Sequence, residues 1–503
     1  MKLSDLFQSS GASIQCPQLD TLDQEIREVV YDSRGAAQGT LFVCLKGLNA
    51  DGHRFAAQAY ASGCRAFLCS DPVELPPDAL VAFCPDTRAA LAQVSAAFYG
   101  FPAQQIKLIG VTGTKGKTTA ANLIYSLLND SGISAGVVGS NGIDFCGQHF
   151  PTMNTTPESC EIHKYLRRMV DAGVQAVAME VSSQALFTHR VDGITFDLAV
   201  FTNLSPDHIG YGEHPSFEHY KNSKKSLFSH CRQALFNRDD PAWTDMAEGI
   251  DYPFFTYGLE SDADFTADEL VPQKSGNRLG TAFTVHYKGQ ALHTALSLPG
   301  SFNVSDALAA FACGALLGLA PDAMARSLPG ISVKGRFETV DALPYAATII
   351  DYAHNEMSLT SLLQTVRSYS PNRILCIFGS VGGRTQHRRK ELGEVAGKLA
   401  DLAVITSDNP NFEDPDAIVN EIAEHFGLGS CPYVCIPDRA EAIRYALHHA
   451  QEGDVLLFCG KGHEDHQLIN GVFEPFSERE LILKTAAEME RNGTLHPSPQ
   501  ENA

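Results

Sequence analysis

The feature that most constrains this chain is the segment from Lys107 to Asn129, where an apolar run, a glycine-rich turn and an amphipathic stretch follow one another. Residues 108–111 predict a buried strand, and residues 120–128 predict a helix. The turn between them, residues 112–119, reads TGTKGKTT. Such a turn presents backbone N–H groups at the start of a helix, where those donors and the helix dipole stabilise a phosphate.

The side chains of the turn favour a bound nucleotide. Lys117 is placed to reach the terminal phosphates, and the hydroxyl of Thr118 is placed to bind Mg²⁺. The usual P-loop has four residues between its first glycine and the Gly-Lys-Thr triplet, whereas five separate Gly110 from Gly116 here. An ordinary glycine-rich turn does not account for two lysines and a run of threonines at a helix start. The segment therefore predicts a variant nucleotide-phosphate site.

Composition limits the partners that the chain can have. Its 503 residues are too many for one hydrophobic core. The formal net charge of −21 argues against a nucleic-acid partner. No run of 18 apolar residues is present, so we expect no membrane insertion. The thirteen cysteines are scattered, and reduced thiols in the cytoplasm fit that pattern best.

The alternation of predicted strands and helices indicates an α/β fold of three domains. Residues 1–100 mix short strands and helices and form a small first domain. Residues 101–331 alternate strand and helix, which implies a mostly parallel sheet, although residues 250–300 are expected to form antiparallel hairpins. Residues 332–491 predict a doubly wound, Rossmann-like domain. The polar tail, residues 492–503, is expected to be disordered.

Three polar residues after the turn are candidates for catalysis. Glu180 follows a predicted buried strand, at the edge where open α/β sheets bind ligands, and a carboxylate there can hold Mg²⁺. A solvent-facing glutamate at a strand end is the alternative. His208 is either a metal ligand or a structural histidine. Lys224 lies on a predicted helix beside apolar residues, and taken alone it is a surface lysine.

In this order along the chain, the phosphate turn and these residues resemble the Mur ligases, ATP-dependent amide-forming enzymes of peptidoglycan precursor synthesis. Within that family the chain is most similar to the members that add the third peptide residue. The resemblance covers nearly the whole chain. The segments that carry it are 113–118, 154–157, 180–183, 189–190, 203–208, Lys224, 302–304, 335–338, 351–354, 408–410 and 460–464.

The resemblance implies an ATP site with magnesium. Asn303 would contact adenine, while Arg336 and Asp351 would contact phosphate and ribose. The ATP-binding residues of the turn would be Gly113, Thr114, Lys115, Gly116, Lys117, Thr118 and Thr119. The magnesium ions would be served by Thr118, Glu180, His208 and Lys224, the last as a carbamate formed with carbon dioxide. The catalytic residues would be Lys117, Glu180, His208 and Lys224.

The resemblance also implies two further binding regions, both for small molecules. The first domain would bind the uridine end of UDP-MurNAc-L-Ala-D-Glu, and the central domain its peptide end. The contacts with this substrate would come from Ser33, Leu48, Asn49, Ala50, Asn154, Thr155, Thr156, Ser182 and Arg190. The C-terminal domain would bind the amino acid that is added, through Arg384, Asp408, Asn409, Pro410, Asn411, Gly460 and Glu464.

The added amino acid is expected to be a diamino acid, with L-lysine favoured. In the family, the Asp-Asn-Pro segment continues with arginine when the acceptor is meso-diaminopimelate, because the guanidinium pairs with the distal carboxylate. Here Asn411 follows, and its neutral amide offers a weaker hold. The intact motif at residues 460–464 supports the alternative, meso-diaminopimelate. Arg388 and Arg389 are candidates to replace the missing arginine.

Other functions are less consistent with the sequence. A folate polyglutamate ligase shares the central ATPase domain but lacks the uridine-binding domain that residues 32–34 indicate. An inactive nucleotide-binding scaffold would not need to retain the catalytic set of Lys117, Glu180, His208 and Lys224. A P-loop GTPase would require an Asn-Lys-x-Asp signature, which does not occur.

Overall fold

The computed structural model describes residues 1–47, 50–207, 209–210, 212–260, 262–383, 386–427 and 430–497. These residues divide into two compact units. The first unit consists of Met1–Thr266 and Leu308–Ala320, and the second consists of Ala267–Ala307 and the chain from Pro321 onward. The chain passes between the units three times: inside strand β13 (Phe265–Ser275), inside helix α10 (Ser301–Leu316), and between Ala320 and Pro321. The first unit therefore holds the predicted N-terminal domain and most of the predicted central domain.

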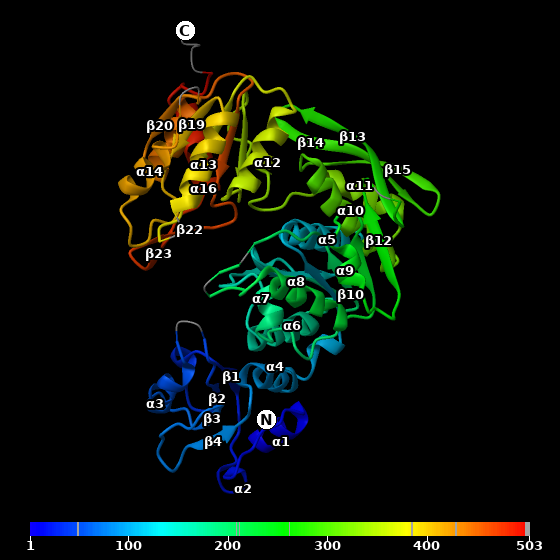
Figure 1. Cartoon of the computed structure of the whole chain (residues 1–503), viewed down its shortest axis with the longest axis vertical. Coiled ribbons are helices and arrows are strands. Elements are labelled where there is room, and N and C mark those ends of the chain that lie inside the picture. The colour runs from blue at the N-terminus through cyan, green and yellow to red at the C-terminus, as the bar shows by residue number, and fades with distance from the viewer. Residues whose placement is uncertain are drawn as a thin grey trace. The chain divides into compact units, whose positions relative to one another are not determined.

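The N-terminal part of the first unit is a four-stranded parallel sheet with helices on both faces (Figure 1). Its strands, in spatial order, are β1 (Glu28–Val30), β2 (Thr40–Val43), β3 (Ala66–Cys69) and β4 (Leu80–Phe83). Its helices are α1 (Leu3–Ser10), α2 (Leu19–Leu22), α3 (Ala56–Ala61) and α4 (Thr87–Phe98). Because successive side chains of a strand point to opposite faces, Leu41 packs in the core with α1 and α4, while Phe42 packs in the core with α3.

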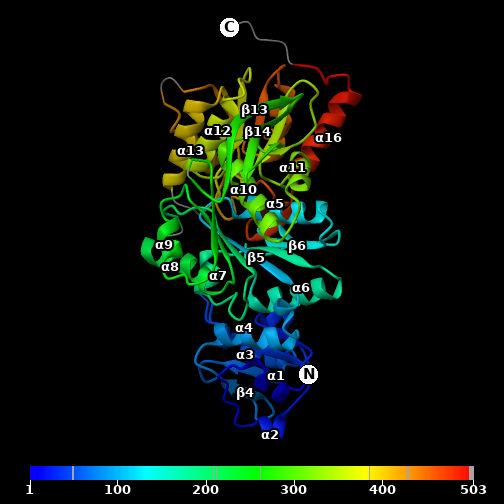
Figure 2. The same ribbon diagram turned by 90° about the vertical axis from the view of Figure 1, so that its right-hand side faces the viewer.

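The rest of the first unit is built on a larger sheet, in which β5 (Lys107–Thr112) is central and leads into helix α5 (Lys117–Asp130). The spatial order is β13-β12-β11-β10-β5-β9-β6-β7-β8. The remaining strands are β6 (Ala135–Gly139), β7 (Gly142–Phe145), β8 (Gln148–Phe150), β9 (Ala176–Glu180), β10 (Leu198–Phe201), β11 (Ala234–Asn237) and β12 (Phe254–Gly258). The other helices are α6 (Ser159–Asp171), α7 (Ser183–Phe187), α8 (Phe217–Lys225) and α9 (Trp243–Ala247). Figure 2 shows β5 and β6 between α5 on one side and α6 on the other.

Parallel pairing runs without interruption from β12 to β6. Strands β9 and β10 are buried along their whole length, as expected for a parallel sheet covered on both faces. In a parallel sheet all carboxyl ends lie at the same edge. This edge carries the phosphate turn after β5, Glu180 at the end of β9, and residues 202–207 after β10.

The second unit contains the antiparallel hairpin that the sequence predicted between residues 250 and 300. Strands β14 (Arg278–Tyr287) and β15 (Gln290–Leu296) pair antiparallel, and helix α11 (Pro321–Ser327) follows later in the chain. The predicted start of the hairpins at residue 250 is wrong, since β12 pairs parallel with β11 and the first residues of β13 pair parallel with β12. Apolar alternation marks a strand but does not reveal its direction.

The C-terminal part of the second unit is a doubly wound sheet, as predicted. The order is β16-β17-β21-β18-β19-β20, and only β16 runs antiparallel to its neighbour. Strand bounds are β16 (Glu338–Thr339), β17 (Ala347–Asp351), β18 (Ile374–Phe378), β19 (Leu402–Ile405), β20 (Tyr433–Cys435) and β21 (Val455–Cys459), with a separate hairpin of β22 (His466–Ile469) and β23 (Val472–Pro475). The helices are α12 (Glu356–Arg367), α13 (Gln386–Leu399), α14 (Pro415–Ala423), α15 (Arg439–His448) and α16 (Glu478–Arg491). Figure 2 shows α12 and α13 on the side of this unit opposite α16.

The disordered tail was expected to begin at Asn492, but the first residues after Asn492 are packed against the rest of the chain. The N–H of Thr494 donates to the carbonyl oxygen of Met489 (2.8 Å), and Leu495 packs against the core of the C-terminal sheet. Residues 498–503 lie outside the described residues. Across the described ranges, no helix combines the length and the apolar character needed to cross a bilayer.

Candidate functional site

Two glycines shape the phosphate turn. Gly113 has φ 155° and Gly116 has φ 84°, conformations that favour glycine. A Cβ atom on Gly113 would lie 1.9 Å from Oγ1 of Thr202, so the close approach of the segment after β10 also requires glycine. Lys117 opens α5 and folds back, and its Nζ donates to the carbonyl oxygens of Gly113 (2.8 Å) and Thr114 (3.1 Å).

The segment after β10 fixes the turn from outside. The N–H of Lys115 donates to Oδ1 of Asn203 (2.8 Å), and the N–H of Thr114 donates to the carbonyl oxygen of Asn203 (2.8 Å). The ammonium of Lys115 lies 3.2 Å from Oδ2 of Asp207. His208 follows directly but lies outside the described residues.

Glu180 and Thr118 form a pair of oxygen donors beside the turn. Oγ1 of Thr118 donates to Oε2 of Glu180 (2.8 Å), and the N–H of Ser140 donates to Oε1 (2.8 Å). A Cβ atom on Gly139 would lie 2.1 Å from the same Oε1, so the backbone must approach the carboxylate closely. Glu180 is fully buried, which excludes the solvent-facing alternative. A carboxylate and a hydroxyl in this arrangement suit Mg²⁺, which prefers oxygen ligands.

Lys224 is a buried amine rather than a surface lysine. It lies on α8 with 1% of its surface exposed, and its Nζ donates to the carbonyl oxygen of Gly113 (2.8 Å). Burial lowers the pKa of Lys224 well below its usual range, and the positive charge of Lys117 lowers that pKa further. Burial and the neighbouring cation therefore favour the neutral amine, the nucleophilic form, beside the phosphate turn.

Several predicted substrate residues gather next to β9. Oγ1 of Thr156 donates to the carbonyl oxygen of Glu180 (2.8 Å) and accepts from the N–H of Ser182 (3.0 Å). Nη1 of Arg190 donates to the carbonyl oxygen of Thr156 (2.9 Å). The structure thus brings Thr156, Ser182 and Arg190 within one hydrogen-bonded group that touches the carboxyl end of β9.

Glu158 joins this group to the N-terminal sheet. Its Oε1 lies 3.1 Å from Nε of Arg190 and 3.3 Å from Nη1 of Arg88 at the start of α4. Thr155 bonds through its hydroxyl to Ser140 (2.9 Å), while Asn154 is exposed. Neither Arg88 nor Glu158 was among the predicted residues, because nothing local in the sequence shows that α4 and α6 are neighbours.

The predicted uridine residues are only partly described. Ser33 begins a short 3₁₀ turn, and its hydroxyl donates to Oε1 of Gln58 (3.4 Å). The carbonyl oxygen of Ala50 accepts from the N–H of Gly47 (2.9 Å). Leu48 and Asn49 lie outside the described residues.

The predicted adenine, phosphate and ribose contacts lie in the second unit. Asn303 on α10 is nearly buried, and its Nδ2 donates to the carbonyl oxygen of Pro299 (2.8 Å). The carboxylate of Asp351, at the end of β17, accepts from the N–H groups of Phe337 and Ala353 (both 2.8 Å).

The positively charged side chain of Arg336 affects two acidic groups in this region, Asp306 and Asp351. Burial raises the pKa of Asp351, and the positive charge of Arg336 opposes that shift. Burial also raises the pKa of Asp306, on α10, well above its usual range, again opposed by Arg336. The guanidinium of Arg336 lies 4.8 Å from the centre of the Tyr352 ring. Arg336 therefore lies near an aromatic ring and close enough to two acidic groups to affect their pKa values.

The predicted amino-acid residues converge on a lysine that the sequence prediction missed. Lys461 is fully buried, and its Nζ lies 2.8 Å from Oε2 of Glu464, 3.0 Å from Oδ1 of Asn409 and 3.6 Å from Oδ1 of Asp408. Nδ2 of Asn409 donates to the same Oε2 of Glu464 (3.0 Å). A Cβ atom on Gly460 would lie 2.8 Å from Oδ2 of Asp408. Lys461 thus contacts three of the side chains predicted to face the amino acid, those of Asp408, Asn409 and Glu464.

Asn411 has a structural role. It adopts φ 53°, and its N–H donates to the carbonyl oxygen of Leu468 (2.8 Å). Its Oδ1 accepts from the N–H of Gly471 (2.9 Å), and its carbonyl oxygen accepts from the N–H of Asn470 (2.8 Å). Asn411, which follows Pro410, therefore anchors the β22–β23 hairpin.

Arg389 does not replace the missing arginine. It is 3% exposed, and its guanidinium pairs with both carboxylate oxygens of Glu413 (2.7 and 2.6 Å) and with Glu421. Because those bonds occupy both terminal nitrogens, the expectation that Arg389 offers a free cation is wrong. Arg388 is half-buried, and Arg384 lies outside the described residues.

Comparison with known proteins covers almost the whole chain. Residues 25–99 match the model of the Mur ligase family, catalytic domain; residues 111–314 match the Mur ligase middle domain; and residues 335–462 match the Mur ligase, glutamate ligase domain.

Two curated relatives bear the name UDP-N-acetylmuramoyl-L-alanyl-D-glutamate--2,6-diaminopimelate ligase. The one from Caldanaerobacter subterraneus subsp. tengcongensis is 37% identical over 493 residues, which is 98% of this chain and 100% of that protein. The one from Geobacillus kaustophilus is 40% identical over 474 residues, covering 92% and 95%. A solved structure of a ligase of this name is 27% identical, with a TM-score of 0.65 and coverage of 93% and 96%.

Proposed function

Since this chain belongs to the Mur ligase family, we propose that it adds meso-diaminopimelate to the D-glutamate carboxylate of UDP-MurNAc-L-Ala-D-Glu, with ATP converted to ADP and phosphate. The chain is an acid–amino-acid ligase that acts on small molecules. The observation that carries the ATP-dependent part of the proposal is the convergence of Lys117 and Lys224 on the carbonyl oxygen of Gly113, beside Thr118 and Glu180.

The phosphate turn supplies the binding site for ATP in this proposal. The N–H groups of residues 113–119 and the positive end of α5 would hold the phosphates. Lys117 would leave its internal carbonyl partners and reach the terminal phosphates, and Lys115 would remain anchored by Asp207. Asn303, Arg336 and Asp351 stay the predicted contacts for adenine, phosphate and ribose.

The donor set beside the turn fits Mg²⁺, because Thr118 and Glu180 present a hydroxyl and a carboxylate oxygen 2.8 Å apart. His208 stays a predicted ligand. Bound Mg²⁺ would neutralise the charge of the transferring phosphoryl group.

Lys224 is suited to become a carbamate. Its neutral nitrogen would attack the carbon of carbon dioxide, forming an N–C bond and releasing one proton. The resulting anion would lie near the cations of Lys117 and Lys115, which already affect the pKa of Lys224. A carbamate on Lys224 would supply a further oxygen ligand for Mg²⁺ at a sequence position where the chain has no glutamate or aspartate.

The reaction would proceed by two substitutions. A carboxylate oxygen of D-glutamate attacks the γ-phosphorus of ATP, the bond to the β–γ bridging oxygen breaks, and ADP leaves. The amine of the amino acid then attacks the acyl carbon of the acyl phosphate, and phosphate leaves with the amine's proton passing to solvent. The chain's part is to hold the two anionic partners together, a task for cations and backbone donors.

Residues near the carboxyl end of β9 would bind the peptide end of the UDP substrate. Thr156, Ser182 and Arg190 are mutually hydrogen-bonded there, and Asn154 and Thr155 precede them. Ser33, Leu48, Asn49 and Ala50 stay the predicted uridine contacts. We further propose a cytoplasmic location, because ATP and nucleotide-linked precursors are cytoplasmic metabolites.

The relatives support diaminopimelate better than lysine, since both are named for the former. The preference for L-lysine as the added amino acid rests on the neutral side chain of Asn411. Asn411 anchors a hairpin, so its neutrality is a poor guide to the amino acid. Glu464 and Asp408, positioned by Lys461, are the groups proposed to face the acceptor's charges.

One assay tests the proposal. Purified chain is incubated with ATP, Mg²⁺ and UDP-MurNAc-L-Ala-D-Glu, and meso-diaminopimelate, L-lysine, ornithine and alanine are offered separately. Phosphate release and a mass gain of one diaminopimelate residue are expected with the first amine. No phosphate release with any amine would overturn the ligase reaction, and a preference for lysine would overturn the acceptor alone.

A further inference from the structure

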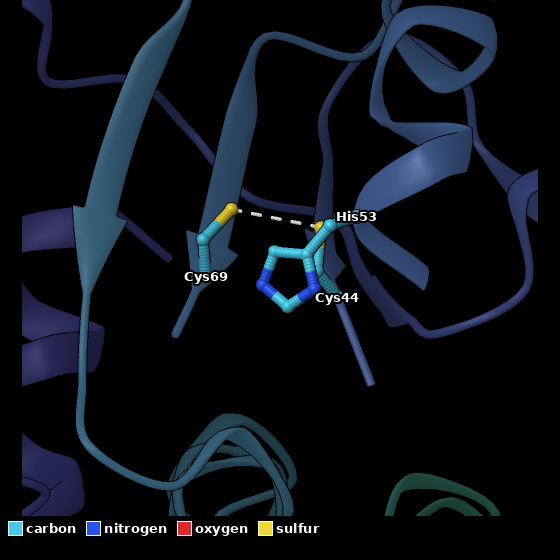
Figure 3. Close-up of side chains that lie close together, drawn as sticks. All are labelled: Cys44, His53 and Cys69. Atoms are coloured by element: carbon cyan, nitrogen blue, oxygen red, sulfur yellow. Dashed lines mark hydrogen bonds between the residues drawn. The ribbon is translucent and has the colours of Figure 1, made fainter. Parts of the chain in front are cut away.

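Two thiols and an imidazole meet beside the N-terminal sheet, apart from the proposed magnesium ligands. They belong to Cys44, Cys69 and His53, which Figure 3 shows side by side. One ligand atom from each lies within 4.8 Å of the others. The two cysteines are 25 positions apart, so the sequence alone gives no sign of the cluster.

The sheet register brings the thiols together. Val43 of β2 lies opposite Leu68 of β3, so the next residues, Cys44 and Cys69, are also opposite, with side chains on the same face. Their Sγ atoms are 3.6 Å apart, and both residues are fully buried. Two sulfur atoms bound at about 2.3 Å to one tetrahedral ion would be about 3.8 Å apart. The observed separation therefore already matches two thiolates on one ion.

His53 is oriented by a carboxylate, as metal-binding histidines commonly are. Its Nδ1 lies 2.6 Å from Oδ1 of Asp51. Its Nε2 accepts from the N–H groups of Ser70 (3.0 Å) and Asp71 (3.2 Å). Since both nitrogens have partners, an ion at the cluster would replace one of these bonds. Only 8% of the imidazole side chain is exposed, so the ring is largely sheltered from water.

From this geometry we propose that Cys44, Cys69 and His53 bind a thiophilic divalent cation of the zinc type. Two thiolates and an imidazole are ligands that zinc prefers, whereas Mg²⁺ prefers oxygen. The fourth position would go to water or to a carboxylate oxygen of Asp51 or Asp71. Oδ2 of Asp71 lies 3.9 Å from Nε2 of His53.

The site would be distinct from the magnesium ligands and would respond to pH. Each thiol loses its proton when it binds an ion, so binding strengthens as pH rises. Cys44 and His53 lie on either side of residues 45–51, the segment that includes three of the predicted uridine contacts.

Cobalt spectroscopy tests the proposal on the full chain. Co²⁺ is added in the presence of excess Mg²⁺, which occupies oxygen-lined sites, and thiolate-to-cobalt charge-transfer absorption is titrated. One equivalent is expected to give the band. Cys44→Ala and Cys69→Ala are each expected to lose most of it. Cys64→Ala is the matched control, because Cys64 is a buried thiol just before β3 whose Sγ is bonded to the carbonyl oxygens of Thr40 and Ala66. This variant should keep the band.

A measurement without substitutions covers the case in which a variant misfolds. X-ray absorption of the zinc-loaded, unmodified chain should show two sulfur neighbours per zinc. A shell of oxygen and nitrogen alone would overturn the proposal. Three results with cobalt would also overturn the proposal. The unmodified chain could show no charge-transfer band, both cluster variants could keep the band, or Cys64→Ala could lose the band to the same extent as the cluster variants.

Discussion

Lys224 shows how surroundings alter the chemistry of a single side chain. A lysine beside apolar residues on a helix is typically a surface residue with a buried stem. Here the amine itself is buried and donates to the carbonyl oxygen of Gly113, and its pKa is well below the usual range. A neutral amine reacts with carbon dioxide, whereas an ammonium does not. Burial is thus the physical condition for the proposed carbamate.

Replacing Lys224 should nearly abolish activity. In Lys224→Ala we expect kcat to fall by about a hundredfold or more, since a group that stabilises the transferring phosphoryl charge is lost. Small carboxylates such as formate or acetate should partly restore the rate, because they can occupy the place of the carbamate. Steady-state phosphate release measures both effects. Lys225→Ala is the matched control, as Lys225 pairs with Glu248 at the surface (2.8 Å); full activity of Lys224→Ala would contradict its role.

Lys461 is a positioning residue for the proposed amino-acid site. In Lys461→Met, Glu464 and Asn409 lose a charged partner, which we expect to cost about 2 kcal/mol of amino-acid binding, or roughly thirtyfold in KM. The KM for ATP should change little, and this split separates a positioning effect from general loss of structure. Lys398→Met, at an exposed lysine of α13, serves as the control. An unchanged KM for the amino acid would argue against the assignment.

Helix α6 carries a feature that bears on stability rather than on catalysis. His163 is fully buried, and neither ring nitrogen has a hydrogen-bond partner among the described residues. Burial lowers its pKa from 6.5 to about 4. The folded chain therefore resists protonation that the unfolded chain accepts, so stability contributed above pH 6.5 is lost as pH falls toward 4.

This predicts a specific acid sensitivity. Between pH 6.5 and 4, His163 is protonated in the unfolded chain but not in the folded chain. This difference should lower the free energy of unfolding by about 3 kcal/mol at the acid end of the range. Urea denaturation at several pH values measures it, and His163→Leu should show a correspondingly smaller pH dependence. His387→Leu, at a histidine with 77% of its side chain exposed, should behave like the unmodified chain. Identical pH dependence in His163→Leu would contradict the prediction.

Helices and strands could be predicted where a short stretch of sequence carries the pattern that forms them. Strands β5 and β9 are continuous apolar runs in a covered parallel sheet, and the turn after β5 carries its own glycines and lysines. Glu180 could be placed because the carboxyl end of a parallel strand faces the ligand edge. The direction of β12 could not be predicted, because it depends on how the chain crosses the sheet. Lys461 was missed for a related reason: its importance lies in contacts with Asn409, 52 positions earlier.

Among the described residues, each of the two units has a hydrophobic core of its own, and this should appear in unfolding. The single tryptophan, Trp243, packs against the core around β5 and β9 in the first unit, so its fluorescence reports on that unit. Far-ultraviolet circular dichroism reports on both. We expect the two urea transitions not to coincide, as for chains with more than one cooperative unit. Coincident midpoints and slopes would show that the units unfold together.

Asn411 has a consequence for how amino-acid preference changes in evolution. Asparagine tolerates positive φ better than most residues, and here its side-chain oxygen also holds the β22–β23 hairpin through Gly471. A mutation to arginine would introduce a cation but would remove that anchor. Lineages should therefore gain or lose a cation at this position together with changes in the hairpin, by paired rather than single substitutions. A specificity rule that considers position 411 alone will misassign chains in which the hairpin has changed as well.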